Sequence, residues 1–246
     1  MATKLVYLEE CNVIRTKAVV TKVYDTEDGQ RVVELDQTCF YPRGGGQDWD
    51  TGKITAGDVR FDVIMVRLDE SGVVQHYGTF ASGLLTQGDA VECEVDASRR
   101  QVNTRLHSAG HLIDMAVERL GLTWVPGKGA HYPHMSFVEY QTGDDIVDET
   151  VKQSIQKKLD ELIVQGDYEN KILFIPVSEM SRYCRHIPNN IPTNKPARIV
   201  LYADTFGIPC GGTHVRRVRD IGKIEVSKIK SKKGIIKVSY RVEGVN

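Results

Sequence analysis

The sequence predicts an α+β protein: a small N-terminal β-barrel followed by an α+β domain with helices on a mostly antiparallel sheet. Short strand-like runs separated by glycine-rich turns fill the first 95 residues. Two runs with helical periodicity follow, and further strand-like runs alternate with them as far as residue 242. We therefore expect two domains, a barrel at 1–95 and an α+β domain at 96–246.

The composition is that of a soluble globular protein with a large core. The 246 residues are 41% hydrophobic and 26% charged. A membrane span is not expected, because no run of about eighteen apolar residues occurs, and residues 1–6 lack the apolar core of a signal peptide. The five cysteines are scattered and odd in number, so they do not make a disulfide framework. A reducing, cytoplasmic location is the natural interpretation.

The barrel strands are predicted by β-rich runs. Residues 17–36 form a predicted hairpin that turns at Asp28-Gly29, and residues 61–66 and 91–95 are further strands. The glycine run at 44–46 is expected to be a loop. It lacks the Lys-Ser/Thr ending of a phosphate-binding P-loop and does not open a helix, so nucleotide binding is not expected there.

A long helix is predicted from about residue 101 to 120, capped by Asp96 or Ser98 and ended by Gly121. Its apolar positions recur at helical spacing: Leu106, Ala109, Ile113, Ala116, Val117 and Leu120. Residues four apart lie one turn above each other, so His107 and His111 point the same way.

After the long helix, the sequence predicts one more helix and several strands. The segment 122–131 is expected to be broken by its glycines, and a helix is expected at 148–165. His131 and His134 flank a proline and are expected to face solvent. The remaining strands are expected at 135–140, 171–177, 197–202, 223–230 and 235–242, with 171–177 buried on both faces and the last two forming a hairpin across Lys233-Gly234.

A second cluster of metal-ligand residues stands at Cys210-Gly211-Gly212-Thr213-His214. Its two glycines allow a tight bend that can aim a thiolate and an imidazole at one point. Together with His107 and His111 this is a borderline-soft ligand set of the kind zinc prefers. A pair of ordinary helix histidines is the simpler interpretation of the first cluster alone, and a papain-like nucleophile is disfavoured because no helix start follows Cys210.

Basic residues are concentrated directly after this cluster. Ten lysines and arginines lie between Val215 and Arg241, against two acidic residues. Such a run is often only a solvated face, but beside a metal site it favours contact with an RNA backbone. The candidate RNA-binding residues are Arg216, Arg217, Lys230, Lys232 and Lys233.

Four stretches resemble one known family. Residues 107–111 and 210–215 are similar to the two metal-binding motifs in the editing domain of alanyl-tRNA synthetases, and most similar to those of the free-standing alanyl-tRNA editing proteins called AlaX. Residues 40–47 resemble the glycine-rich motif of the longer AlaX forms, which carry an N-terminal barrel, and residues 231–234 resemble a further motif near the C-terminus. These stretches occur in the family's order along nearly the whole chain.

The resemblance implies a zinc-dependent hydrolase that removes serine or glycine from mischarged tRNA(Ala), with the acceptor end of the tRNA as its partner. His107, His111, Cys210 and His214 are the implied catalytic and metal-binding residues. The candidate substrate contacts are Gly45, Gly46, Lys128, Gly211, Gly212 and Thr213. In related domains a Thr or Gln after the long helix distinguishes serine from alanine, whereas Gly127, Lys128 and Gly129 stand in that region here. The discriminating residue is therefore not assigned.

Several alternatives stay open at this point. Four protein ligands are typical of a closed structural zinc site, whereas a catalytic zinc keeps one coordination position open. Either one of the four residues therefore does not bind the metal, with His214 the first candidate, or the metal mainly positions the substrate. A non-catalytic, zinc-stabilised tRNA-binding module is the main rival function. A small-molecule zinc hydrolase would not need the basic segment, and the predicted barrel and editing domain leave no ATP-dependent domain within these residues. The oligomeric state is not predicted.

Overall fold

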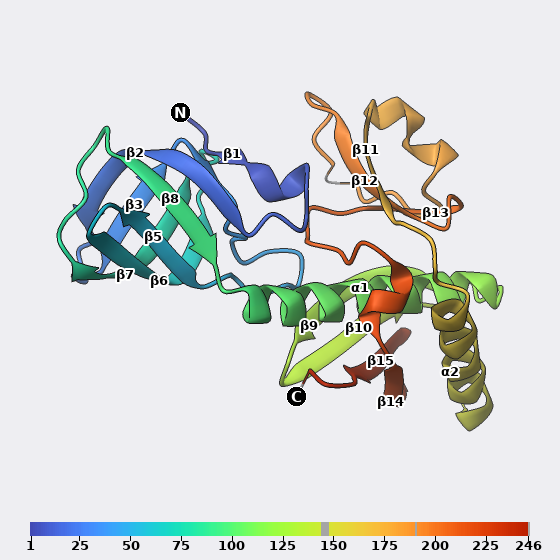
Figure 1. The fold of residues 1–246 in the computed structure, drawn as a ribbon. Helices are drawn as coiled ribbons and strands as arrows, with labels where there is room; N and C mark the ends of the chain where they lie inside the picture. Colours follow the sequence, from blue (N-terminus) through green and yellow to red (C-terminus); the bar gives the residue numbers. More distant parts are fainter. Residues whose placement is uncertain (144–147, 190, 246) are drawn as a thin grey trace. The chain divides into compact units, whose positions relative to one another are not determined.

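The computed structural model describes residues 1–143, 148–189 and 191–245. The chain divides into two compact units, the first made of Met1–Gly44 and Asp48–Gln101 and the second of Gly45–Gln47 and Val102–Asn246. Figure 1 shows the elements of both, coloured along the sequence. Among the described residues, the helices fall short of the length and apolar character that crossing a membrane requires.

The first unit is built on a closed β-barrel with the strand order β2-β3-β7-β6-β5-β8. Its strands are β2 (Arg15–Asp25), β3 (Arg31–Leu35), β5 (Gly52–Ala56), β6 (Val59–Leu68), β7 (Val74–Ser82) and β8 (Ala90–Val95). All six neighbouring pairs are antiparallel, and in the β2–β3 hairpin Asp25 lies opposite Arg31. The predicted barrel and its first hairpin are confirmed. Outside the barrel, β1 (Lys4–Leu5) pairs in parallel with β4 (Gln37–Thr38).

Alternation along the strands fills the barrel. Val33 and Leu35 of β3, Phe61 and Val63 of β6 and Cys93 of β8 are all buried in one apolar cluster. Because side chains of a strand alternate between its two faces, every second residue points into the interior. The barrel therefore has a packed core of its own.

The second unit packs two helices against two antiparallel sheets. Helix α1 (Ala97–Arg119) starts in the first unit and continues through the second, and α2 (Glu149–Val164) follows later in the chain. The larger sheet has the order β14-β15-β10-β9, with β9 (Val125–Tyr132), β10 (Met135–Gln141), β14 (Ile224–Lys232) and β15 (Ile235–Val242). The smaller sheet has the order β11-β12-β13, with β11 (Lys171–Ile175), β12 (Ala197–Tyr202) and β13 (Phe206–Pro209). The predicted α+β architecture is confirmed.

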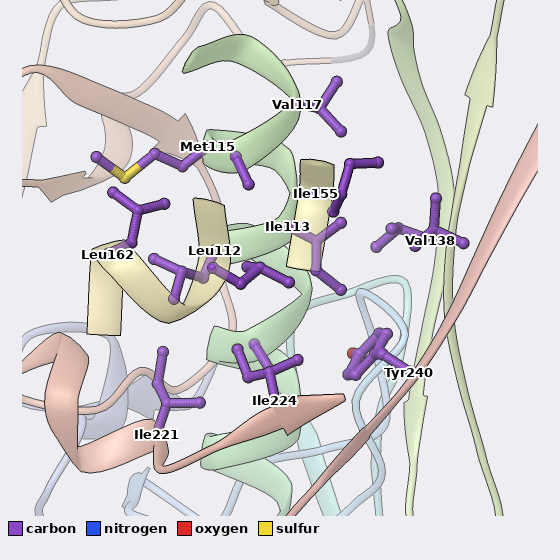
Figure 2. Packing of buried hydrophobic residues seen from close by; sticks show 14 of the residues in the cluster. Leu112, Ile113, Met115, Val117, Val138, Ile155, Leu162, Ile221, Ile224 and Tyr240 are labelled. Carbon is purple, nitrogen blue, oxygen red and sulfur yellow. The ribbon is translucent and has the colours of Figure 1, made fainter. Parts of the chain in front are cut away.

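Helix α1 is the centre of this unit's core. Figure 2 shows Leu112 and Ile113 of α1 among side chains from α2 and the larger sheet, including Ile155 and Val138. Of the predicted stripe, all residues except the half-buried Leu120 are buried, and Leu112 and Met115 are buried as well. Since neighbouring positions are covered, α1 is enclosed on more sides than a surface helix with one apolar stripe.

The start and end of α1 follow local chemistry. The Asp96 carboxylate accepts the N–H groups of Ser98 and Arg99 at 2.9 and 3.1 Å, so Asp96 is the cap and Ser98 lies inside the helix. Gly121 adopts a φ of 72°, a left-handed conformation that glycine adopts without steric cost, and ends the helix as predicted.

The prediction that glycines break the chain at residues 122–131 is wrong for most of that segment. Strand β9 runs through Pro126, Gly127 and Gly129, and Gly129 lies opposite Val138 of β10. Because β9 is the outer strand of its sheet, a proline there costs no bond to a further strand. Pairing with β10 therefore overrides the weak strand propensity of the segment.

Two features of the smaller sheet also differ from the prediction. Strand β11 is an outer strand rather than one buried on both faces, and Phe174 is 49% exposed. The apolar run is typical of a central strand, but among the residues that the structure describes β12 is the one strand that pairs with it. A further strand, β13, is not predicted from the sequence; it pairs with β12 and leads directly to Cys210.

Candidate metal centre

Helix α1 supplies two imidazoles. His107 and His111 lie one turn apart, and the His107 ring is buried with only 1% of its surface exposed. The ring centroids are 4.8 Å apart, and the two Nε2 atoms are 3.1 Å apart. The i, i+4 spacing therefore brings both rings to one side of α1, as predicted.

The segment after β13 supplies the other two ligand-type residues. The Cys210 Sγ lies 3.1 Å from His107 Nε2 and accepts the Gly212 N–H at 3.3 Å. A Cβ at position 212 would lie 2.6 Å from His107 Nε2, so any residue other than glycine would clash with that ring. Ser108 anchors the end of the segment, because its hydroxyl accepts the Val215 N–H at 3.0 Å.

The four residues form a cluster that can hold a metal ion. One ligand atom from each of His107, His111, Cys210 and His214 lies within 4.8 Å of the others. Among the described residues, both ring nitrogens of His214 and Nδ1 of His107 are buried without a hydrogen-bond partner. Unpartnered buried nitrogens are costly, and a metal ion would use a lone pair of His214 that the protein leaves free. The donor set and its geometry therefore fit a bound cation.

Electrostatics within the cluster favour the thiolate of Cys210. Burial raises the pKa of a thiol, but His107, His214 and His111 outweigh it and hold the pKa of Cys210 well below its usual range. Burial also works against protonation of His111, yet Cys210 and Asp114 raise the pKa of His111 to about 10. Burial lowers the pKa of His107 to about 4. The Cys210 thiolate and the neutral His107 imidazole are in the form that binds metals, whereas His111 would release its proton when a metal ion binds.

A carboxylate orients one of the imidazoles. Asp114 Oδ2 lies 3.4 Å from His111 Nδ1, and Asp114 Oδ1 accepts the Tyr140 hydroxyl at 2.7 Å. Metal-binding histidines commonly donate their second N–H to such a carboxylate, which fixes the tautomer and leaves Nε2 free for the metal. Asp114 therefore gives His111 the environment of a metal ligand.

A fifth histidine lies against the cluster, and the expectation that it faces solvent is wrong. His131 on β9 is 4% exposed, and its ring centroid is 4.8 Å from that of His107. His131 Nδ1 lies 2.6 Å from the Tyr240 hydroxyl, which itself donates to Leu106 O at 2.9 Å. His131 Nδ1–H is therefore the donor, and burial holds the pKa of His131 well below its usual value. His134 is exposed, as predicted.

A pocket of about 510 Å³ opens beside the cluster, within the second unit. His111 and Asp114 of α1, Trp124, Tyr140 of β10 and the loop 185–189 contribute to its walls. Apolar and aromatic walls with a few polar groups are typical of a small-molecule site. The pocket therefore gives a ligand a route to His111.

The candidate substrate contacts lie in different surroundings. Lys128 is exposed on β9, and the pocket lining includes its neighbour Gly127 instead. Gly211 is exposed at the bend, whereas Thr213 is fully buried. Gly46, in the glycine-rich segment, accepts the His131 N–H on its carbonyl oxygen at 2.8 Å. The sequence analysis did not single out Gln47, which donates to the Thr213 hydroxyl at 2.9 Å.

The predicted RNA-binding residues fall into two groups. Arg216 pairs with Glu169 at 2.9 Å, and Arg217 pairs with Asp167 at 2.5 Å, so both arginines are engaged within the protein. Lys230, Lys232 and Lys233, in contrast, are exposed at the end of the β14–β15 hairpin and form no salt bridge among the described residues. Lys230 lies directly opposite Lys237 of β15, whose ammonium lies 3.7 Å from Glu139.

The chain is similar to known proteins over most of its length. A profile described as tRNA synthetases class II (A) matches residues 3–99. The alanine–tRNA ligase of Halobacterium salinarum is 31% identical over 237 residues, covering 91% of this chain and 24% of the ligase. The ligase of Halorubrum lacusprofundi is 32% identical over 222 residues, covering 86% of this chain and 22% of the ligase. The ligase of Haloquadratum walsbyi is 27% identical over 236 residues, covering 91% of this chain and 24% of the ligase. This chain thus spans about a quarter of the length of these relatives. Over most of its own length, the chain is similar to part of alanine–tRNA ligases.

Proposed function

We propose that the chain is a trans-acting editing hydrolase, which removes serine or glycine from mischarged tRNA(Ala) at a zinc site in the cytoplasm. The observation that carries the proposal is the convergence of two histidines of α1 with Cys210 and His214 beside a pocket. Similarity to part of alanine–tRNA ligases supports tRNA(Ala) as the substrate. The family similarity covers only part of those enzymes, so the activity rests mainly on the site.

The ligand chemistry supports zinc as the cofactor. Three imidazoles and one thiolate are a set that zinc binds readily in tetrahedral geometry. When bound, zinc supplies polarisation of the ester carbonyl and lowers the pKa of a water molecule. His107, His111, Cys210 and His214 are the residues that would hold it. Position 108 is Ser, where zinc peptidases with a His-Glu-x-x-His motif carry a glutamate base, and an ester needs less assistance than a peptide.

The pocket fits the end of an aminoacyl-tRNA. The amino acid would lie near His111, and Trp124 and Tyr140 offer aromatic surface to it or to the terminal base. Arg185 and His186 line the same pocket and can contact the terminal phosphates. In hydrolysis the water oxygen bonds to the carbonyl carbon, the bond from that carbon to the ribose oxygen breaks, and the ribose oxygen takes a proton.

We assign a role in this step to the bend at Cys210. Gly211 and Gly212 have backbone N–H groups beside the cluster, and such groups stabilise the negative charge that develops on a carbonyl oxygen. The Gly212 N–H already lies 3.3 Å from Cys210 Sγ, so Gly211 is the better candidate for this contact.

The strand register brings the basic hairpin end toward the pocket. Lys232 lies opposite Ile235, Ile235 lies opposite Gln141, and Gln141 lies opposite Val125, which lines the pocket. The end of the β14–β15 hairpin and the pocket therefore share one end of the sheet. An RNA strand that enters the pocket would pass this positively charged end.

Of the predicted RNA contacts, three lysines fit this role best. Lys230, Lys232 and Lys233 are exposed and unpaired among the described residues, so their charges are available to phosphates. Arg216 and Arg217 would first have to leave their acidic partners. We therefore assign the main electrostatic contact to the lysines and a minor one to the arginines.

The direct test is hydrolysis of Ser-tRNA(Ala), Gly-tRNA(Ala) and Ala-tRNA(Ala), with and without a zinc chelator. We expect release of serine or glycine, loss of activity on chelation and recovery when zinc is added back. A wild-type protein that binds zinc and tRNA without releasing any amino acid would instead be a binding module, and the proposed hydrolase would be wrong.

Replacing Cys210 by Ala separates the two metal arrangements. If the thiolate is a ligand, the variant loses both zinc and activity. Lost activity with full zinc occupancy would show that Cys210 lies off the metal, which would then be held by the three histidines with one open position.

A further inference from the structure

The glycine-rich segment of residues 45–47 belongs to the same compact unit as the metal centre, although the barrel strands surround it in the sequence. Gln47 is fully buried there, with 0% of its surface exposed. Buried amides are stabilising only when their polar atoms find partners. The partners of Gln47 therefore show what this segment does.

Both ends of the Gln47 amide bond to one residue. Nε2 donates to the Thr213 hydroxyl at 2.9 Å, and Oε1 accepts the Thr213 backbone N–H at 3.1 Å. Thr213 lies between Gly212 and His214, in the bend that carries two of the four candidate ligands. Two bonds from one planar amide fix both the position and the orientation of the residue that they hold.

Helix α1 completes this connection. The Thr104 hydroxyl lies 2.6 Å from the Thr213 hydroxyl, and Thr104 stands three residues before His107. The chain Gln47–Thr213–Thr104 thus joins the ligand-bearing bend to the helix that carries the other two ligands. All three residues are buried, so water does not compete for these bonds.

The glycine before Gln47 is required by close packing. Gly46 has a φ of 75°, and a Cβ there would lie 2.4 Å from Gly129 O and 3.1 Å from the His131 ring. The Gly46 carbonyl also accepts the His131 N–H at 2.8 Å. Glycine therefore lets the backbone lie against β9, and from there the Gln47 side chain reaches Thr213.

We propose that Gln47 is a positioning residue for the metal: through Thr213 it holds Cys210 and His214 at the distance from His107 and His111 that one ion requires. The inference rests on the metal site of the proposed function. The glycine-rich segment then helps to hold the four metal ligands in place, in addition to any contact that Gly45 and Gly46 make with substrate. Partners of this kind contribute about 10- to 100-fold to metal affinity.

The test compares the full-length Gln47→Leu, Gln47→Glu and Thr38→Val variants with wild type. Leu is similar in size to Gln but makes neither bond, whereas a protonated Glu can reproduce both. Thr38→Val is the matched control, because Thr38 is a fully buried residue of the first unit whose hydroxyl bonds His76 at 2.9 Å, and the metal residues belong to the second unit. Zinc affinity is measured by chelator competition, cobalt substitution reports ligand geometry by visible absorption, and thermal unfolding reports stability.

We expect Gln47→Leu to bind zinc about 10- to 100-fold more weakly and to change the cobalt spectrum. Gln47→Glu should lie between it and wild type, and Thr38→Val should lose stability with zinc affinity unchanged. Equal zinc affinity and spectra for Gln47→Leu and wild type would overturn the inference, as would an equal loss of affinity in Thr38→Val. If Gln47→Leu does not fold, a Gln47→Glu variant with weakened zinc affinity or an altered cobalt spectrum still supports the role, and wild-type affinity with an unaltered spectrum counts against it.

Failure of the proposed function gives a different result. Wild-type protein that binds zinc and responds to the Gln47 variants, but does not hydrolyse any aminoacyl-tRNA, would refute the hydrolase and leave the positioning role standing. Wild-type protein without zinc affinity would overturn both.

Discussion

Replacing Asp114 by Asn should weaken zinc binding with little change in the fold. Asp114 lies 3.4 Å from His111 Nδ1 and receives the Tyr140 hydroxyl at 2.7 Å. Asn keeps the volume and one carbonyl oxygen for Tyr140, but it loses the negative charge that orients the imidazole and increases its basicity. The variant therefore isolates the electrostatic effect of the carboxylate.

The expected magnitude follows from the geometry. A hydrogen bond to a charged group contributes about 1.5–3 kcal/mol, and about 1.4 kcal/mol corresponds to a tenfold change in affinity. This range gives roughly a 10- to 100-fold loss, in line with other carboxylates behind metal-bound histidines. Since 3.4 Å is long for such a bond, we expect a value near 10-fold.

Competition with a chromophoric zinc chelator at constant pH measures the effect. Tyr140→Phe is the control, because it removes the hydroxyl that Asp114 accepts and leaves the carboxylate in place, so a smaller loss is expected. If Asp114→Asn kept wild-type affinity while Tyr140→Phe lost it, the carboxylate would not be acting through His111 and the reasoning would be refuted.

Three further predictions concern the barrel, the RNA contact and the core. Burial holds the pKa of His76 at about 4, below its usual 6.5. As the pH falls from 6.5 to 4, the unfolded chain therefore takes up a proton at His76 that the folded barrel does not. The barrel should lose about 3 kcal/mol of stability over this range, as measured by urea unfolding. His76→Gln should remove most of this pH dependence, and an unchanged slope would contradict it. Changing Lys230, Lys232 and Lys233 together to Gln should weaken tRNA binding and reduce the slope of log affinity against log salt by about 2–3, whereas an unaltered slope would mean that RNA binds elsewhere. Ile155→Ala, in the centre of the second core, should cost about 2–5 kcal/mol in chemical unfolding, and a cost below about 1 kcal/mol would mean that the surrounding helices close the cavity.

The ligand pairs could be predicted because each is local. The four-residue spacing on a helix places His107 and His111 on one side of the helix. The glycine bend brings Cys210 and His214 close together within a few residues. That both pairs meet was an expectation from ligand chemistry, and the structure brings the four side chains together. Periodicity also predicted both helices and the closing hairpin, because their patterns repeat over many residues.

Features that depend on distant partners could not be predicted in the same way. His131 was expected in a loop because glycines surround it, yet pairing with β10 makes the segment a strand and places the ring against His107. Gln47 ends the glycine-rich motif, but its role could not be predicted, because its partner Thr213 lies 166 residues later. Strand order, which made β11 an outer strand, is likewise set by the whole sheet.

The two lysines that face each other across β14 and β15 have a consequence for the free protein. Lys230 and Lys237 occupy directly opposite positions, where like charges repel, and Glu139 at 3.7 Å offsets only part of that repulsion. This repulsion lowers the stability of the hairpin, and the same two charges would attract the RNA proposed above. Amide hydrogens of this hairpin should exchange more slowly when RNA neutralises the pair, so that substrate itself would stiffen the surface that receives it.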